Sequence, residues 1–179
     1  MHSFSISYIF YVFLVSLVIT MSKVAIEEPY ELVNKVCKKQ GNQKFCVEVL
    51  KSDTRSEFAK DIRTLTAIAV DVATKNTTAT RNYFQRVKTG PPGVLKSLKS
   101  CIDLYNNVIM NLKICLHEED CSLIGYDIHV ARDEVMFCQE IADSNRAHDS
   151  FITTSNDVTL EFCGLGESLA NLMCYETRA

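Results

Sequence analysis

Four stretches of the chain carry apolar residues at alternating steps of three and four, the spacing that places side chains on one face of an α-helix. The first stretch begins at Phe58 and ends at the breaker Thr89-Gly90-Pro91-Pro92-Gly93. The others predict helices over about 95–116, 122–142 and 158–172. The expected inward residues are Phe58, Ile62, Leu65, Ala69, Val72, Ala79, Tyr83 and Val87, then Leu95, Leu98, Cys101 or Ile102, Tyr105, Val108 or Ile109, Leu112 and Leu116, then Ile128, Ala131, Val135 and Cys138, and finally Val158, Phe162, Leu165, Leu169 and Leu172.

Long amphipathic helices joined by short connections favour an antiparallel up-down-up-down four-helix bundle, here over residues 56–176. Residues 29–52 carry two shorter helical patterns on either side of Lys39-Gln40-Gly41-Asn42, which predicts a helical hairpin ahead of the bundle. Tryptophan is absent and only three prolines occur, a composition that suits helices better than a turn-rich β-sandwich. The predicted fold class is therefore all-α, with a single domain over residues 26–178.

An uncharged apolar leader precedes this domain. Residues 4–19 read FSISYIFYVFLVSLVI, and the first charged side chain after the start is Lys23. The pattern is typical of a secretory signal peptide, and the run falls short of the ~20 residues that span a bilayer. We predict a signal peptide over residues 1–22, with cleavage near Ser22 or as late as Ala25. We therefore expect a secreted protein that has no membrane association after cleavage. The alternative is that the leader is a signal anchor.

Eight cysteines lie after the leader, and secretion explains them because disulfides persist in oxidising compartments. Cys37 and Cys46 flank the hairpin turn, so their Cα atoms can approach within the ~4.4–6.8 Å that a disulfide requires. Cys101 lies near the start of the second bundle helix and Cys138 near the end of the third, which are level positions in an antiparallel pair. Disulfides Cys37–Cys46 and Cys101–Cys138 are predicted.

The other four cysteines are harder to pair. Cys163 and Cys174 lie on one predicted helix, ~16 Å apart at ~1.5 Å per residue, and cannot bond to each other there. Cys115 and Cys121 flank the second connection of the bundle, and the end of the last helix should reach the same place. Cys115–Cys121 is the first choice, Cys174 is the competitor for either partner, and Cys163 is expected to be a buried thiol.

Charge and motifs indicate a protein without catalytic or metal chemistry. The net charge is −3, with no basic cluster of the kind that binds nucleic acid or an anionic membrane. The chain lacks G-x-S-x-G, H-E-x-x-H, P-loop and G-x-G-x-x-G patterns. A zinc site could be formed by Cys115, His117 and Cys121, but a fourth ligand at the usual spacing is missing. We expect no cofactor, no metal and no enzymatic activity.

One N-glycosylation sequon occurs, Asn76-Thr77-Thr78. It lies on the first apolar stripe, where a glycan would collide with bundle packing. Asn76 is therefore a glycosylation candidate whose occupancy the sequence leaves open.

Several segments resemble the plant invertase and pectin methylesterase inhibitors. They are ELVNKVCKKQGNQKFCVEVLKSD at 31–53, CIDLYNNVIMNL at 101–112, ARDEVMFC at 131–138 and SNDVTLEFCGLGESLANLM at 155–173. The resemblance implies a disulfide in the N-terminal hairpin and a second within the bundle, which fall on the two pairs predicted above. It also implies a secreted plant protein of the apoplast, with the vacuole as the alternative, that inhibits one of two unrelated enzymes.

The target is less evident than the family. Invertase-directed members can carry Pro-Lys-Phe in the second connection of the bundle, and the corresponding positions here are Cys121-Ser122-Leu123. This departure favours inhibition of pectin methylesterase, and the resemblance implies that bundle helices would lie over the active-site cleft of that enzyme. Invertase inhibition and a non-inhibitory structural, signalling or pollen role are the alternatives. The acidic residues that could meet a basic enzyme surface, or be merely solvated, are Glu57, Asp61, Glu118, Glu119 and Asp120.

Overall fold

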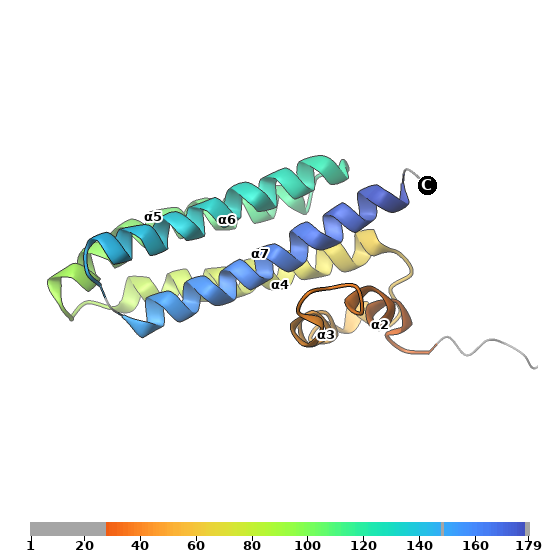
Figure 1. The fold of residues 1–179 in the computed structure, drawn as a ribbon, viewed down its shortest axis with the longest axis horizontal. Coiled ribbons are helices and arrows are strands. Elements are labelled where there is room, and N and C mark those ends of the chain that lie inside the picture. The colour runs from red at the N-terminus through yellow and green to blue at the C-terminus, as the bar shows by residue number, and fades with distance from the viewer. Residues whose placement is uncertain (1–27, 148, 178–179) are drawn as a thin grey trace, which may run out of the picture.

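The computed structural model describes residues 28–147 and 149–177, so the predicted signal peptide lies outside the described residues (Figure 1). This part of the chain contains helices and no strand. None of its helices is long and apolar enough to cross a membrane. The elements are α2 (Glu31–Cys37), α3 (Gln43–Lys51), the short 3-10 helix η1 (Thr54–Ser56), α4 (Ile62–Arg86), α5 (Pro92–Cys115), α6 (Cys121–Ser144) and α7 (Ser150–Glu176).

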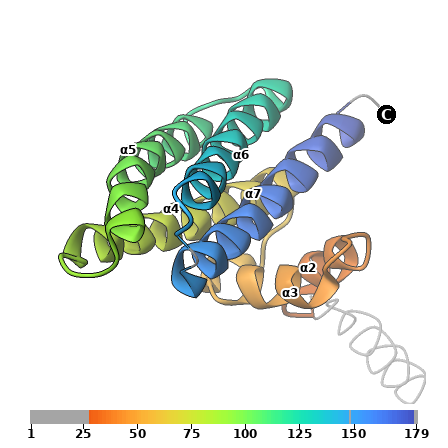
Figure 2. The same cartoon turned by 60° about the vertical axis from the view of Figure 1, so that its left-hand side comes forward.

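Helices α4 to α7 form an antiparallel bundle in which each packs against two neighbours. Helix α5 lies against α4 and α6, and α7 lies against α6 and α4, so the four helices close into a square (Figures 1 and 2). The α5–α6 connection and the end of α7 share one end of the bundle, and the other two connections share the opposite end. The predicted up-down-up-down four-helix bundle with a preceding hairpin is confirmed.

Aspartates mark where three of the bundle helices begin. Asp61, Asp120 and Asp149 each accept a hydrogen bond from a backbone N–H two or three residues later in the chain. Such caps satisfy amide groups that have no partner within the helix. The remaining bundle helix, α5, begins at Pro92, which is suited to a first helical position because its missing N–H is not needed there.

The ends of two predicted stripes lie outside the helices. Phe58 was expected to face inward, but α4 begins only at Ile62, after the Asp61 cap, and Phe58 is 58% exposed. Leu116 follows the last residue of α5 and is 37% exposed. Both predictions are wrong because the chain leaves the helical path there, so the three-four spacing no longer determines where a side chain points.

The second half of α4 buries a different face from the one predicted. Ala79 and Tyr83 are exposed, whereas Thr77 and Phe84 are buried. Thr77 is accommodated in the core because its hydroxyl donates a hydrogen bond to the carbonyl oxygen of Ala73 at 2.8 Å. The prediction is wrong because it counted only apolar residues, while a threonine bonded to its own helix backbone can occupy a core position.

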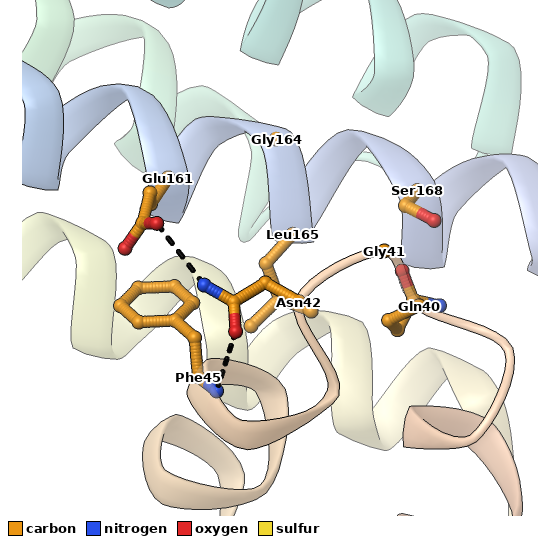
Figure 3. A pocket seen from close by; sticks show the side chains of 8 residues that line it. All are labelled: Gln40, Gly41, Asn42, Phe45, Glu161, Gly164, Leu165 and Ser168. Carbon is orange, nitrogen blue, oxygen red and sulfur yellow. Dashed lines mark hydrogen bonds between the residues drawn. The ribbon is translucent and has the colours of Figure 1, made fainter.

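The hairpin of α2 and α3 packs against the bundle through α4 and α7. The Phe45 ring meets the Phe162 ring edge-on at 5.1 Å between centroids. The side chain of Asn42 accepts a hydrogen bond from the Phe45 N–H at 3.2 Å and donates one to the Glu161 carboxylate at 3.1 Å (Figure 3). One asparagine thus caps α3 and ties the hairpin to α7.

A charged cluster joins the segment after the hairpin to α4. The Arg55 guanidinium donates hydrogen bonds to the carboxylates of Asp53 and Asp71, and Lys75 donates to Asp71 at 3.0 Å. The hydrogen bond from Arg55 is the main cause that lowers the pKa of Asp53 to about 2. The hydrogen bond from Lys75 is the main cause that lowers the pKa of Asp71. Both carboxylates therefore favour the ionised form in the folded protein.

Candidate interaction surface

A disulfide links the first residue of α6 to the last turn of α7. Cys121 bonds to Cys174, with a Cα–Cα distance of 5.4 Å. The first-choice pairing of Cys115 with Cys121 is therefore wrong, and the competing pairing with Cys174 is present. Cys115 lies in the last turn of α5 with its side chain in the core, where its thiol donates to the carbonyl oxygen of Asn111 at 3.2 Å. The same thiol lies 3.7 Å from the carbonyl oxygen of Ile124, whereas Cys121 is bonded to α7.

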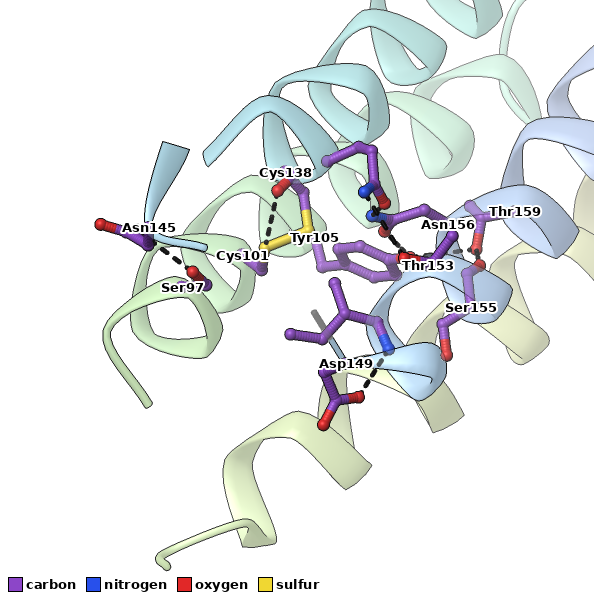
Figure 4. Close-up of a disulfide and its surroundings, with 12 residues drawn as sticks. Ser97, Cys101, Tyr105, Cys138, Asn145, Asp149, Thr153, Ser155, Asn156 and Thr159 are labelled. Atoms are coloured by element: carbon purple, nitrogen blue, oxygen red, sulfur yellow. Dashed lines mark hydrogen bonds between the residues drawn. A yellow bond between two sulfur atoms is a disulfide. The ribbon is translucent and has the colours of Figure 1, made fainter. Parts of the chain in front are cut away.

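The structure also contains the Cys37–Cys46 and Cys101–Cys138 bridges, with Cα–Cα distances of 5.6 Å and 4.9 Å. The first closes the hairpin, and the second joins α5 to α6 (Figure 4). The α5–α6 and α6–α7 bridges together attach α6 to one neighbour near each of its ends. The helices that flank α6 are thereby held in fixed register.

Two cysteines are free thiols, Cys115 and Cys163, and both are buried. Burial raises the pKa of each to about 12, so neither forms a reactive thiolate under mildly acidic or neutral conditions. Within the described residues no group of three or more histidine, cysteine or acidic side chains is placed to hold a metal ion. The zinc cluster considered above is also divided, since Cys121 is bonded to Cys174.

A polar network crosses the core next to the Cys101–Cys138 bridge (Figure 4). The Tyr105 hydroxyl donates to Asn156 Oδ1 at 2.9 Å and lies 3.3 Å from the Thr159 hydroxyl. The Asn156 amide in turn donates to Gln139 at 2.9 Å. The apolar stripes alone do not predict this network, although Asn156 and Thr159 follow each other at helical spacing on α7. It connects α5, α6 and α7 through satisfied polar groups.

The connection between α5 and α6 is held against α4. The Arg63 guanidinium donates to the carbonyl oxygens of Glu118, at 3.4 Å, and Glu119. The Glu118 carboxylate accepts from the N–H groups of Glu119 and Asp120 at 2.8 Å and 3.0 Å. Glu118 and Asp120 therefore organise the connection, as Asp61 caps α4. Of the five acidic residues proposed to meet an enzyme, the carboxylates of Asp61, Glu118 and Asp120 thus accept hydrogen bonds within the chain.

The tripeptide Cys121-Ser122-Leu123 forms the first turn of α6 rather than part of a protruding loop. Leu123 is 48% exposed and begins an outer apolar stripe on this helix. The stripe continues through Tyr126 and Val130 to Phe137, with Tyr126 64% and Phe137 51% exposed. We call these four residues the α6 outer stripe. It was missed because the inward stripe of the same helix, which is fully buried, already explained the apolar pattern.

A groove between α6 and α7 adjoins this stripe. It has a volume of about 540 Å³. Its lining includes Tyr126, the Cys174 end of the disulfide and Tyr175, which is 73% exposed. Among its other lining residues, His129 Nδ1 lies 3.5 Å from Glu167 Oε1. We call the outer stripe and this groove together the α6–α7 face. Exposed aromatic and aliphatic side chains with a polar rim are typical of protein-binding surfaces.

The sequon lies in the middle of α4. Asn76 is half-buried, and the Thr78 hydroxyl donates to the carbonyl oxygen of Thr74 at 2.7 Å. Occupancy of Asn76 stays a prediction.

Comparison with known proteins gives the evolutionary context of this geometry. A family model described as plant invertase/pectin methylesterase inhibitor matches residues 31–158. The Arabidopsis thaliana protein named cell wall / vacuolar inhibitor of fructosidase 2 is 34% identical over 116 residues, which cover 62% of this chain and 64% of that protein. The match thus spans just under two thirds of that relative. Pectinesterase inhibitor 2 of Arabidopsis thaliana is 26% identical over 146 residues, covering 79% and 83%.

Solved structures share the fold. A mutant form of a pectin methylesterase inhibitor from Arabidopsis superimposes with a TM-score of 0.65 at 22% identity, covering 78% of this chain and 95% of that one. A second pectin methylesterase inhibitor, from Arabidopsis thaliana, gives a TM-score of 0.59 at 20% identity and covers 79% and 95%. These similarities concern the fold alone, whereas the family model matches well over half of the sequence. The chain belongs to the plant invertase/pectin methylesterase inhibitor family.

Proposed function

We propose that the protein is a secreted inhibitor of a plant pectin methylesterase, and that it lays bundle helices over the active-site cleft of the enzyme. The observation that carries the proposal is the α6–α7 face, where the exposed outer stripe lies beside an aromatic-lined groove. A preformed bundle loses little conformational entropy on docking, so a surface of ordinary size can bind usefully. Inhibition of this kind needs no catalytic group on the inhibitor.

The first turn of α6 supports this target over invertase. The positions that correspond to Pro-Lys-Phe are helical here, and Cys121 is fixed by its bond to Cys174. No flexible peptide is therefore available at these positions to enter a deep active site. Invertase inhibition is the second candidate, favoured by the 34% identity to a protein named as an inhibitor of fructosidase. The name of that relative also supports the apoplast or the vacuole as the location.

A paired titration tests the proposal. The refolded, oxidised protein is added in increasing amounts to a plant pectin methylesterase and to a plant acid invertase at mildly acidic pH. We expect stoichiometric loss of pectin methylesterase activity and unchanged invertase activity. Loss of invertase activity alone would select the second candidate. Loss of neither would favour a structural, signalling or pollen role on the same fold.

A further inference from the structure

A second groove lies between α4 and α5, on the opposite side of the bundle from the α6–α7 face. The square packing of the helices separates the two, since α4 and α5 form one side and α6 and α7 the other. The groove has a volume of about 500 Å³. The inhibitory function proposed above makes no use of it.

The charge of this groove is opposite to that of the whole protein. The net charge of the chain is −3, yet the lining includes Arg81, Lys113 and His117 and no acidic residue. Lys113 lies in the last turn of α5, and His117 lies two residues beyond the end of this helix. Neither forms an ion pair within the described part of the chain. Lys113 therefore has no carboxylate partner within the described residues.

Arg81 has unused hydrogen-bonding capacity. One terminal nitrogen, Nη1, donates to the Asn106 side chain at 3.0 Å. Its Nε is the one buried side-chain nitrogen or oxygen in the described residues that lacks a hydrogen-bond partner. The hydrogen bond to Asn106 holds the guanidinium in place, and the planar fork of an arginine suits a carboxylate.

The groove also offers apolar surface. Met110 and Ile114 lie one turn apart on α5 and are 55% and 45% exposed. A simple anion would leave this surface uncovered. A ligand that fits has carboxylates for the basic groups and apolar side chains for the two α5 residues.

We propose that the α4–α5 groove docks an acidic amphipathic helix of a partner protein. From the level of Asn106 to that of His117 the groove runs about 16 Å, which corresponds to about three turns of a bound helix. Such a helix would place its apolar stripe on Met110 and Ile114 and its carboxylates beside Lys113 and Arg81. Charge complementarity requires a partner with negative charge, and the apolar side chains of Met110 and Ile114 require a peptide with a hydrophobic face.

Fluorescence anisotropy with a labelled synthetic peptide tests the proposal. The probe is a helix of about three turns with leucines on one face and glutamates on the other, and the comparison peptide carries lysines in place of the glutamates. We expect the full oxidised protein to bind the acidic peptide, more weakly as salt is added, and not the basic one. Arg81→Gln with Lys113→Gln should weaken binding about tenfold or more.

Matched variants separate the groove from the overall charge. Lys38→Gln with Lys39→Gln removes the same charge from two exposed lysines of the hairpin and should leave binding unchanged. Met110→Ser should weaken it without any change in charge. If circular dichroism shows that replacement of Arg81 impairs folding, the single variant Lys113→Gln replaces the double variant in the binding test.

Several results would overturn the proposal. These are failure of the acidic peptide to bind, equal binding of the basic peptide, and equal losses in the groove and hairpin variants. Enzyme inhibition is a separate readout. The groove variants should inhibit the target enzyme as strongly as the wild type does. The result of the peptide-binding experiment therefore does not depend on which enzyme the protein inhibits.

Discussion

The hydroxyl of Tyr105 donates a hydrogen bond to Oδ1 of Asn156 at 2.9 Å in the interior of the bundle, where both residues are at most 1% exposed. Burial raises the pKa of Tyr105 well above its usual range, so the hydroxyl keeps its proton and remains a donor. The bond joins α5 to α7, which are diagonal partners in the square of helices. The two helices are thus linked across the centre of the bundle by a polar contact rather than only by apolar packing.

Replacement of Tyr105 by phenylalanine should lower the free energy of unfolding by about 1–2 kcal/mol, because the buried Asn156 Oδ1 loses its donor. Guanidinium-induced unfolding followed by circular dichroism measures the change. Tyr126→Phe removes the same hydroxyl at an exposed position and should change stability by less than about 0.5 kcal/mol. Equal effects of the two variants would contradict a role for the buried hydrogen bond.

Replacement of both Cys121 and Cys174 by serine should destabilise the protein by up to about 4 kcal/mol in the chain-entropy model, given that their sequence separation is 53. Thermal unfolding without reductant provides the measurement. Mass analysis of peptides from the unreduced wild-type protein gives an independent check. It should recover Cys121 joined to Cys174, and a peptide that joins Cys115 to Cys121 would refute the observed pairing.

The two free thiols should be inaccessible in the native protein. Burial raises the pKa of Cys115 and of Cys163 to about 12, so an aromatic disulfide reagent at neutral pH should react with neither. Both should react after unfolding in guanidinium without reductant. Rapid labelling of the folded protein would show that one of these side chains is accessible or paired differently.

Stability should fall between about pH 4 and pH 2. The pKa of Asp53 is lowered to about 2 in the folded protein, below the ~3.9 of an unfolded chain. A depressed carboxyl pKa contributes stability that is fully present above the unfolded value and is lost as pH falls through the folded value. The pKa of Asp71 is also lowered and adds to the same trend. Melting temperatures across this range should decline less steeply for Asp53→Asn than for the wild type.

The α6 outer stripe should carry much of the binding energy for the target enzyme. Leu123→Ser and Phe137→Ser should each weaken inhibition about tenfold or more, because exposed apolar anchors dominate such interfaces. Both side chains are about half exposed, so the melting temperature should change little. Phe58→Ser removes a comparably exposed ring, outside the stripe, and should leave inhibition intact. Loss of inhibition by that variant alone would place the interface elsewhere.

Local patterns in the sequence determined much of the fold. Three-four spacing defined four helices, and the breaker before α5 separated the first two of them. Short connections then required antiparallel neighbours, which made positions such as those of Cys101 and Cys138 level with each other. These features depend on residues close in the chain or on the repeat of one helix, and both can be counted in a sequence.

Tertiary structure decided what depends on how each helix is rotated about its axis. The choice of Phe84 over Tyr83 for the core, and of Cys174 over Cys115 as the partner of Cys121, follows from which side of a helix faces its neighbours. Neighbouring side chains on a helix point about 100° apart. When both neighbours are apolar, or when a threonine takes a core position, the spacing of apolar residues does not tell which of them faces the core. The α6 outer stripe became visible only once the opposite face of that helix was buried.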